Sequence, residues 1–253
     1  MTDNQSPDAA AQRARDRSSA AHDALAARPG VTFSASEDIV IVLHPGFDTL
    51  DAVGPHYFLS SMIGATVHLA TTGAAGEPVT SAGGLPLPPT TTLLDAPEKP
   101  TVLLVPGGDT GVLLADKPAM AAIRRLGQAA GTVASVCTGA IALGAAGLLQ
   151  GRRATTHWSV RHLLAGYGAT PTDERVTADG NVLTAAGVTA GMDLALALVA
   201  RLRGDDYARI LELVAEYAPQ PPFGTGTPES AGPELAAIAR DMLATIEHDL
   251  RAR

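Results

Sequence analysis

The chain has 253 residues, 46% of them hydrophobic, and carries a formal net charge of −8. Its length favours one large domain, and its acidic balance argues against nucleic acid as the main partner, because phosphate binding needs a concentrated basic surface. No apolar run reaches the ~18 residues of a membrane-spanning helix and a single cysteine cannot form an internal disulfide, so we expect a cytoplasmic protein without a membrane partner.

Residues 1–36 are rich in alanine, serine, aspartate and arginine. Residues 11–27 have helical potential, but their apolar side chains are almost all alanine and offer little surface to bury. A segment of this kind gains too little from burial to offset the entropy lost on ordering. We therefore predict a disordered N-terminal extension over residues 1–36.

Residues 37–204 alternate between apolar, β-branched runs and small-residue helical stretches. The predicted strands are residues 39–43, 66–71, 101–105 and 132–136, with hairpins over 79–87 and 175–185. The predicted helices are residues 50–63, 118–130, 138–149, 159–167 and 190–202. Continuous apolar strands that alternate with helices are typical of a doubly wound, mainly parallel sheet in an α/β domain, with helices on both faces.

Residues 205–253 form a C-terminal extension that begins with a predicted helix to about Tyr217. A proline- and glycine-rich arm over residues 219–228 follows. The last predicted helix, residues 233–250, carries apolar side chains at helical spacing, namely Leu235, Ile238, Met242 and Ile246. We expect the helical extension to pack on the domain or on a second subunit.

The one cysteine, Cys137, lies at a predicted strand-to-helix corner, as expected of a nucleophile elbow. The N-terminal end of a helix stabilises a thiolate, which is the reactive form of the side chain. A free cysteine is also often a small buried hydrophobic residue. The corner position favours a nucleophile, with the backbone N–H of Thr138 as a donor to a developing oxyanion.

Two further strand ends carry polar groups toward the same edge of the predicted sheet, where doubly wound domains bind ligands. Asp48 and Asp51 follow the first strand, and either can be a helix cap or a catalytic acid. Gly107 and Gly108 follow the strand at 101–105, and they either close a tight turn or offer N–H groups to an oxyanion.

Four segments together resemble the ThiJ/PfpI superfamily: residues 47–55 (FDTLDAVGP), 104–108 (LVPGG), 136–139 (VCTG) and 187–193 (GVTAGMD). The resemblance covers residues 39–203 and implies a flavodoxin-like fold similar to the class I glutamine amidotransferase domain. Residues 151–158 (GRRATTHW) are similar to those of the isonitrile hydratases and of the sensor domains of AraC-type regulators. A regulator needs a DNA-binding region of roughly a hundred residues after the domain, and residues 205–253 are too few for one. We therefore expect the hydratase type.

The resemblance implies hydration of a small isonitrile to an N-substituted formamide, with Cys137 as the nucleophile and Asp51 as the acid and base. Repulsion between the two groups should leave them one shared proton, with the charge on sulfur. Thr138 stands where the peptidase-type members carry histidine, which argues against peptide hydrolysis and gives its hydroxyl a role at the site. His157 and Trp158 are expected in the wall of the substrate pocket.

We expect no cofactor and no metal, because His157 and His162 are five residues apart and do not match a zinc pair on one helix face. The resemblance also implies a homodimer. Two alternatives stay open: another small-molecule hydrolase or carbonyl-modifying enzyme with the same site, and a redox or ligand sensor in which Cys137 is oxidised or only binds.

Overall fold

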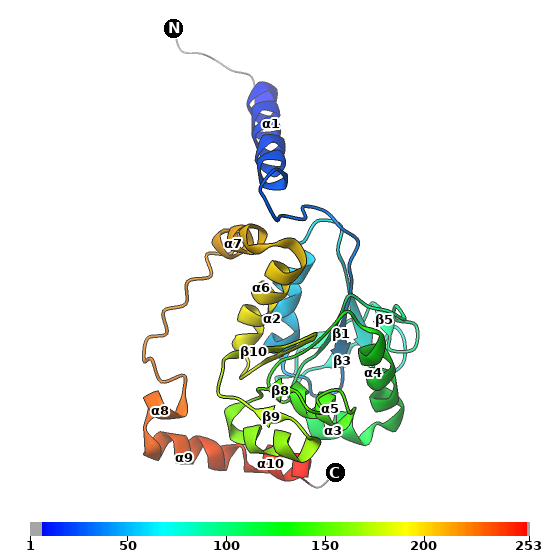
Figure 1. The fold of residues 1–253 in the computed structure, drawn as a ribbon, viewed down its shortest axis with the longest axis vertical. Helices are drawn as coiled ribbons and strands as arrows, with labels where there is room; N and C mark the ends of the chain where they lie inside the picture. The colour runs from blue at the N-terminus through cyan, green and yellow to red at the C-terminus, as the bar shows by residue number, and fades with distance from the viewer. Residues whose placement is uncertain (1–6, 252–253) are drawn as a thin grey trace.

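The computed structural model describes residues 7–251, and its centre is a seven-stranded sheet in the order β10-β11-β7-β6-β1-β2-β5 (Figure 1). All neighbouring strands are parallel except β10 and β11, which form an antiparallel hairpin at one edge. The predicted doubly wound, mainly parallel α/β fold is confirmed. The strands are β1 (Asp38–Leu43), β2 (Thr66–Thr71), β5 (Thr91–Thr92), β6 (Val102–Val105), β7 (Thr132–Ser135), β10 (Val176–Asp179) and β11 (Val182–Ala185).

Helices cover both faces of the sheet because successive side chains of each buried strand point to opposite sides. In β1, Ile39 and Ile41 belong to one apolar cluster and Val40 and Val42 to the other. The helices on the Ile39 side are α2 (Thr49–Ser60), α6 (Ala190–Arg203) and α7 (Asp205–Val214). Those on the Val40 side are α3 (Thr110–Ala115), α4 (Lys117–Ala129), α5 (Gly139–Ala145) and the 3₁₀ helix η1 (Trp158–Tyr167).

Several elements differ from the sequence prediction. Helix α5 ends at Ala145 and not at residue 149, because Gly147 takes a left-handed φ of 77° that closes the helix. The helix predicted over 159–167 is present, as the 3₁₀ helix η1. Helix α3, strand β5 and the pair β8 (Arg153–Ala154) with β9 (Thr170–Pro171) were not predicted, whereas β3 (Val79–Thr80) and β4 (Pro86–Leu87) form the expected hairpin.

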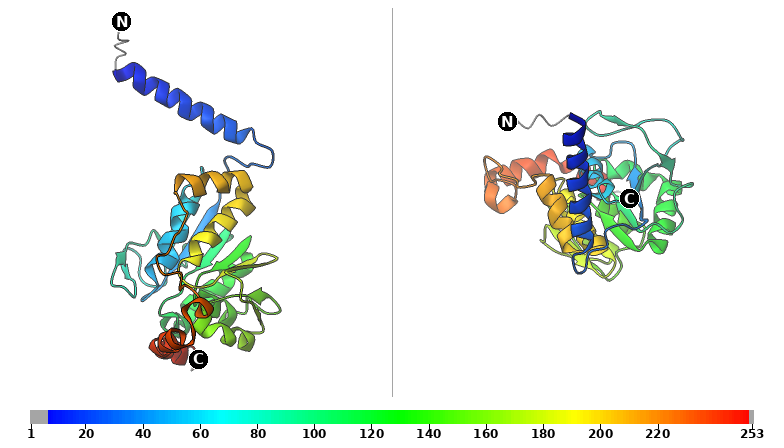
Figure 2. Two further views of the ribbon diagram at one scale, coloured as in Figure 1. Left: turned by 90° about the vertical axis from the view of Figure 1, so that its left-hand side faces the viewer. Right: turned by 90° about the horizontal axis from the view of Figure 1, so that it is seen from above.

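The N-terminal segment also differs from the expected disordered extension. Residues 7–26 form helix α1 (Pro7–Ala26), which projects from the domain with nearly all its side chains exposed (Figures 1 and 2). Leu25, near its end, is buried, and Phe33 packs between His22 and Tyr207. Residues 1–6 of the predicted extension lie outside the described residues.

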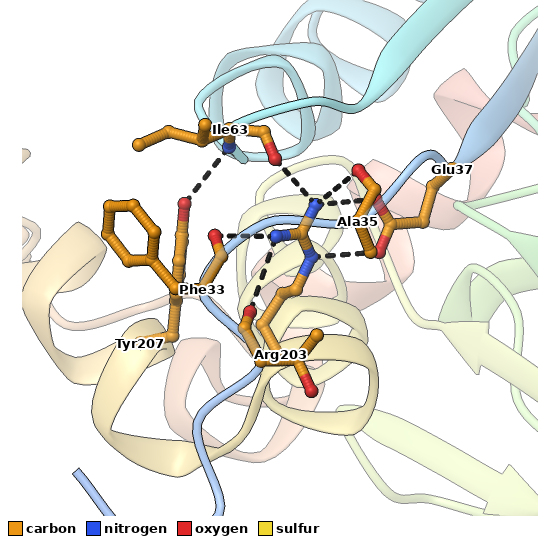
Figure 3. A network of polar contacts seen from close by, with 7 residues as sticks. Phe33, Ala35, Glu37, Ile63, Arg203 and Tyr207 are labelled. Carbon is orange, nitrogen blue, oxygen red and sulfur yellow. Dashed lines mark hydrogen bonds and ion pairs between the residues drawn. The ribbon is translucent and has the colours of Figure 1, made fainter. Parts of the chain in front are cut away.

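A buried ion pair fastens the chain between α1 and β1 to the end of α6 (Figure 3). The Arg203 side chain is fully buried, and its Nε and Nη2 donate to the two oxygens of Glu37 at 2.8 and 2.5 Å. Its remaining N–H groups donate to backbone carbonyls of Thr32, Phe33, Ala35 and Ile63. Every N–H donor of the guanidinium therefore makes a hydrogen bond. A buried charge is tolerated only when its polar groups are satisfied in this way.

The C-terminal extension crosses the lower end of the domain as α8 (Pro228–Ala231), α9 (Pro233–Met242) and α10 (Ala244–Arg251) (Figure 1). The predicted single helix is broken at Leu243, whose φ and ψ of −98° and 5° are not helical. Of the predicted stripe, Ile246 packs against the core, whereas Leu235, Ile238 and Met242 on α9 are exposed. Among residues 7–251, no helix is long and apolar enough to cross a membrane.

Candidate active site

Cys137 forms a strained corner between β7 and α5. Its φ of 54° lies in the left-handed region, which costs a non-glycine residue about 1–3 kcal/mol. The corner is held on both sides: the Cys137 N–H donates to the carbonyl of Ala186 at 2.8 Å, and the Cys137 carbonyl accepts from Oγ1 of Thr156 at 2.6 Å. The strain is thus offset by two hydrogen bonds from neighbouring segments.

Asp51 reaches this corner from the first turn of α2. Its side chain is fully buried, and Oδ2 accepts from the N–H of Gly107 at 2.8 Å. Its other oxygen, Oδ1, has no hydrogen-bond partner among the described residues. The cap of α2 is Asp48, which accepts from the N–H of Leu50 at 3.1 Å, so Asp51 has no capping role.

Burial sets the protonation state of both groups. It raises the pKa of Asp51 to about 8, with a further rise from the charge of Asp48, against the lowering effect of the Gly107 N–H. Burial also raises the pKa of the Cys137 thiol, as do Asp51 and Asp48, although the backbone N–H and the hydroxyl of Thr138 lower it. At neutral pH the structure favours two neutral groups, which differs from the expected thiolate with one shared proton.

The two glycines after β6 hold the catalytic candidates in place. The N–H of Gly107 is used by Asp51, and the N–H of Gly108 donates to Oγ1 of Thr138 at 3.1 Å. The Thr138 hydroxyl also lies 2.7 Å from the hydroxyl of Thr110, which is fully buried. Both N–H groups that were expected to face an oxyanion therefore have partners within the protein.

Gly107 is the point where these groups meet. A methyl group at Gly107 would lie 2.6 Å from the backbone nitrogen and Oγ1 of Thr138, and 3.0 Å from Oδ2 of Asp51. Contacts of this length are too short for any side chain. The absence of a side chain at Gly107 is therefore what allows Asp51 and Thr138 to approach one another.

A cavity of about 410 Å³ has Ala186 in its wall, and the carbonyl of Ala186 accepts from the Cys137 N–H; Cys137 and Asp51 themselves are not among the residues that line it. His157 and Trp158 line it, together with Arg161, Arg175, residues 186–189 and residues 226–229 of the C-terminal arm. The Arg240 guanidinium of α9 lies 5.3 Å from the centre of the Trp158 ring. The arm and the start of α8 thus complete a wall that the domain begins, and Arg240 of α9 lies over one of its residues, Trp158.

His157 lies close enough to the site for a nearby carboxylate to affect its pKa. Burial lowers the pKa of His157, as does Arg161, whereas Asp48 raises it. Its Nδ1 lies 2.8 Å from Oγ of Ser159 at the start of η1. The structure therefore places both predicted pocket residues, His157 and Trp158, beside one cavity, while Asp48 influences Asp51, Cys137 and His157 together.

Three residues at the site were not predicted from the sequence: Thr110, Thr156 and Ala186. Thr156 belongs to the segment 151–158 that carried part of the family resemblance, so a signal for it was present. Thr110 and Ala186 act through a buried hydroxyl and a backbone carbonyl, which leave no chemical signature in a sequence. Within residues 7–251, no three histidine, cysteine or carboxylate side chains come together as a metal site.

Comparisons with known proteins show the family of the chain. Residues 37–201 match the model of the DJ-1/PfpI family. The chain is 46% identical to isonitrile hydratase of Pseudomonas putida over 203 residues, which cover 80% of this chain and 88% of that enzyme. It is 31% identical to the HTH-type transcriptional regulator CdhR of Pseudomonas aeruginosa over 179 residues, which cover 68% of this chain and 53% of the regulator.

A solved structure of a ThiJ/PfpI family protein from Pseudomonas syringae superposes with a TM-score of 0.85 at 39% sequence identity, covering 88% of this chain and 93% of that one. The resemblance drawn from the four sequence segments is thereby confirmed. This chain belongs to the DJ-1/PfpI family.

Proposed function

We propose that this protein is an isonitrile hydratase, which adds water to R–N≡C and releases the N-substituted formamide. The observation that supports it most is a fully buried carboxyl, Asp51, whose pKa of about 8 keeps it protonated beside the one thiol of the chain. An isonitrile carbon must gain a proton and an oxygen, so a proton donor and a nucleophile must face it together. The 46% identity to isonitrile hydratase supports the same substrate class.

The first step forms a C–S bond at the isonitrile carbon. Asp51 gives its proton to that carbon, the Cys137 sulfur attacks the resulting nitrilium, and the thiol proton passes to the Asp51 carboxylate. The product is a thioimidate, R–N=CH–S–Cys137, with Asp51 protonated again. This order suits a thiol with a raised pKa, because its proton leaves only as the C–S bond forms.

Water then replaces the sulfur. Asp51 protonates the nitrogen, and its carboxylate accepts a proton from the water that attacks the carbon, which gives R–NH–CH(OH)–S–Cys137. The C–S bond breaks as the hydroxyl loses its proton and the sulfur regains one through Asp51. The formamide R–NH–CHO leaves, and Cys137 and Asp51 both end in the protonated form in which they began.

Purified protein incubated with cyclohexyl isocyanide is expected to release N-cyclohexylformamide, followed by proton NMR. Cys137→Ala is expected to release none, because no C–S bond can form. Rapid acid quenching during turnover should leave a fraction of the wild-type protein heavier by one substrate molecule on the peptide that contains Cys137. Absence of formamide from wild-type protein across a panel of alkyl and aryl isonitriles would rule out the hydratase assignment.

We further propose that the cavity beside Trp158 holds the substituent R. The ring of Trp158 is held under the Arg240 guanidinium, a contact worth about 0.5–1 kcal/mol at an exposed site. Arg240→Ala is therefore expected to raise KM for cyclohexyl isocyanide about threefold, with kcat and the KM for methyl isocyanide unchanged. Arg124→Ala, at an exposed position on α4, is the control. If Arg240→Ala changed KM equally for cyclohexyl and methyl isocyanide, the pocket would not be the binding site of R.

A further inference from the structure

The peptide unit between Cys137 and Thr138 is bound at both of its ends. Its carbonyl, which belongs to Cys137, accepts from Oγ1 of Thr156 at 2.6 Å. Its N–H, which belongs to Thr138, is a donor that lowers the pKa of the Cys137 thiol. A trans peptide is planar, with its C=O and N–H directed to opposite sides. A bond that fixes the direction of the carbonyl therefore fixes the direction of the N–H as well.

Thr156 is suited to this role by its own surroundings. Its side chain is fully buried, and a carbonyl can only accept, so its hydroxyl must donate to Cys137. The preceding residue, Thr155, donates its N–H to Oγ1 of Thr184 at 2.8 Å and so ties this segment to β11. The Thr156 hydroxyl thus projects from an anchored segment between β8 and η1, outside the corner that it supports.

The corner needs such support because the left-handed φ of Cys137 is strained. Rotation of the 137–138 peptide would relieve the strain and would reorient the Thr138 N–H, the backbone donor that lowers the pKa of the Cys137 thiol. A hydrogen bond accepted by the carbonyl also polarises the same peptide and makes its N–H a stronger donor. Loss of the Thr156 hydroxyl would leave a buried carbonyl without its partner and remove both effects.

We propose that Thr156 is a positioning residue for the nucleophile: its bond to the Cys137 carbonyl holds the 137–138 peptide and, with it, the strained backbone that carries the Cys137 sulfur. The proposal deepens the proposed function, since it names a residue that sets the reactivity of the same thiol. It predicts that Thr156 affects the chemical behaviour of Cys137 even where no isonitrile is present. Thr156 acts on the thiol through the backbone of Cys137.

The chain offers a matched control next to Thr156. Thr155 is the same residue type, is equally buried, and lies on the same segment, but its Oγ1 has no hydrogen-bond partner among residues 7–251. Thr155→Val and Thr156→Val therefore make the same change of shape. Only the second one removes a hydrogen bond to the corner.

The test is the rate of Cys137 alkylation by iodoacetamide as a function of pH, read by intact mass, in variants first shown to be folded by circular dichroism. Thr156→Val is expected to move the midpoint of this profile upward by about one pH unit, because the thiolate loses an oriented donor. It is also expected to lower kcat for cyclohexyl isocyanide about tenfold with little change in KM. Thr155→Val should match wild type in both, and Thr156→Ser should recover most of the wild-type profile.

An unchanged alkylation profile in folded Thr156→Val would overturn the proposal, as would an equal shift in Thr155→Val. Thr156→Ala, which removes the hydroxyl without adding a methyl group, is the second loss variant if valine prevents folding. If neither loss variant folds, Thr156 has a structural role and the proposal fails. The alkylation profile needs no turnover, so failure of the hydratase assay alone would overturn the proposed function and leave the role of Thr156 standing.

Discussion

Asp51→Asn is expected to lose two to four orders of magnitude in kcat for isonitrile hydration, the range typical of a lost general acid. Asparagine has nearly the same shape, and its amide oxygen can still accept from the Gly107 N–H that binds Oδ2 of Asp51. The variant therefore keeps the geometry and removes only the proton that is delivered to the isonitrile carbon. Wild-type kcat should fall as pH rises past about 8, where Asp51 loses its proton.

The same variant is expected to be more stable than wild type at alkaline pH. The pKa of Asp51 is raised from its ordinary value of 3.8 to about 8 in the folded protein, so the folded state binds the proton more tightly than the unfolded chain. Its contribution to stability is complete below about pH 4 and is lost as pH rises toward 8. Each pH unit in this window costs about 1.4 kcal/mol, so Asp51→Asn removes a loss of about 5–6 kcal/mol between pH 4 and pH 8.

Urea unfolding at several pH values between about 5 and 9 measures this difference, and the midpoint for Asp51→Asn should fall less with pH than that of wild type. Asp48→Asn is the matched control, because asparagine caps helices as well as aspartate does. Asp48 raises the pKa of Asp51, so its removal should move the alkaline limb of kcat to lower pH without abolishing activity. Equal pH dependence of unfolding in wild type and Asp51→Asn would contradict the assignment of a buried, protonated carboxyl.

Arg203→Met is expected to lower the free energy of unfolding by about 3–5 kcal/mol, because it leaves the Glu37 carboxylate buried without its partner. It also leaves the carbonyls of Thr32, Phe33, Ala35 and Ile63 without the donors that they now share. Arg203→Lys keeps the charge but cannot reproduce the forked contact with both carboxylate oxygens, so an intermediate loss is expected. Urea unfolding followed by circular dichroism measures each value.

Two further variants separate the ion pair from general effects of mutation. Arg201→Met, at an exposed position in the same last turn of α6, should change stability by less than about 0.5 kcal/mol. The double variant Glu37→Leu with Arg203→Met removes both charges and should recover part of the loss. A small effect of Arg203→Met alone would mean that water reaches Glu37 when the guanidinium is removed.

The central strands and the corner of the domain could be predicted from the sequence, whereas its short peripheral elements could not. Apolar strands such as residues 39–43 and the corner at Cys137 are specified locally, by β-branched residues and by the change to small helical residues, and they were predicted. Strand β5 and the pair β8–β9 have only two residues each, and pairing with distant partners decides them. Helix α1 carries almost no apolar surface, so its helical potential was seen in the sequence but an ordered helix was not expected.

The chemistry of the site was predicted less completely than its location. Asp51, Cys137 and Thr138 come together as the resemblance implied, but their catalytic roles stay predictions. The expected thiolate depended on the helix end, an effect that acts over one turn, whereas burial of the whole corner has the larger influence and raises the pKa of the thiol. Burial is a property of the assembled fold and was not visible in the segment around Cys137. The expected homodimer, the cytoplasmic location and the domain boundaries also stay predictions.

Trp158 is the one tryptophan of the chain, and it lines the same cavity as Ala186, whose carbonyl accepts from the Cys137 N–H. Indole emission from this protein therefore reports on a single place, between the pocket and the Arg240 guanidinium. A molecule that enters the pocket changes the water and charge around that ring, so unlabelled protein provides its own optical signal of occupancy. In Cys137→Ala this fluorescence would follow binding of an isonitrile when no reaction consumes it, and binding would be measured apart from catalysis.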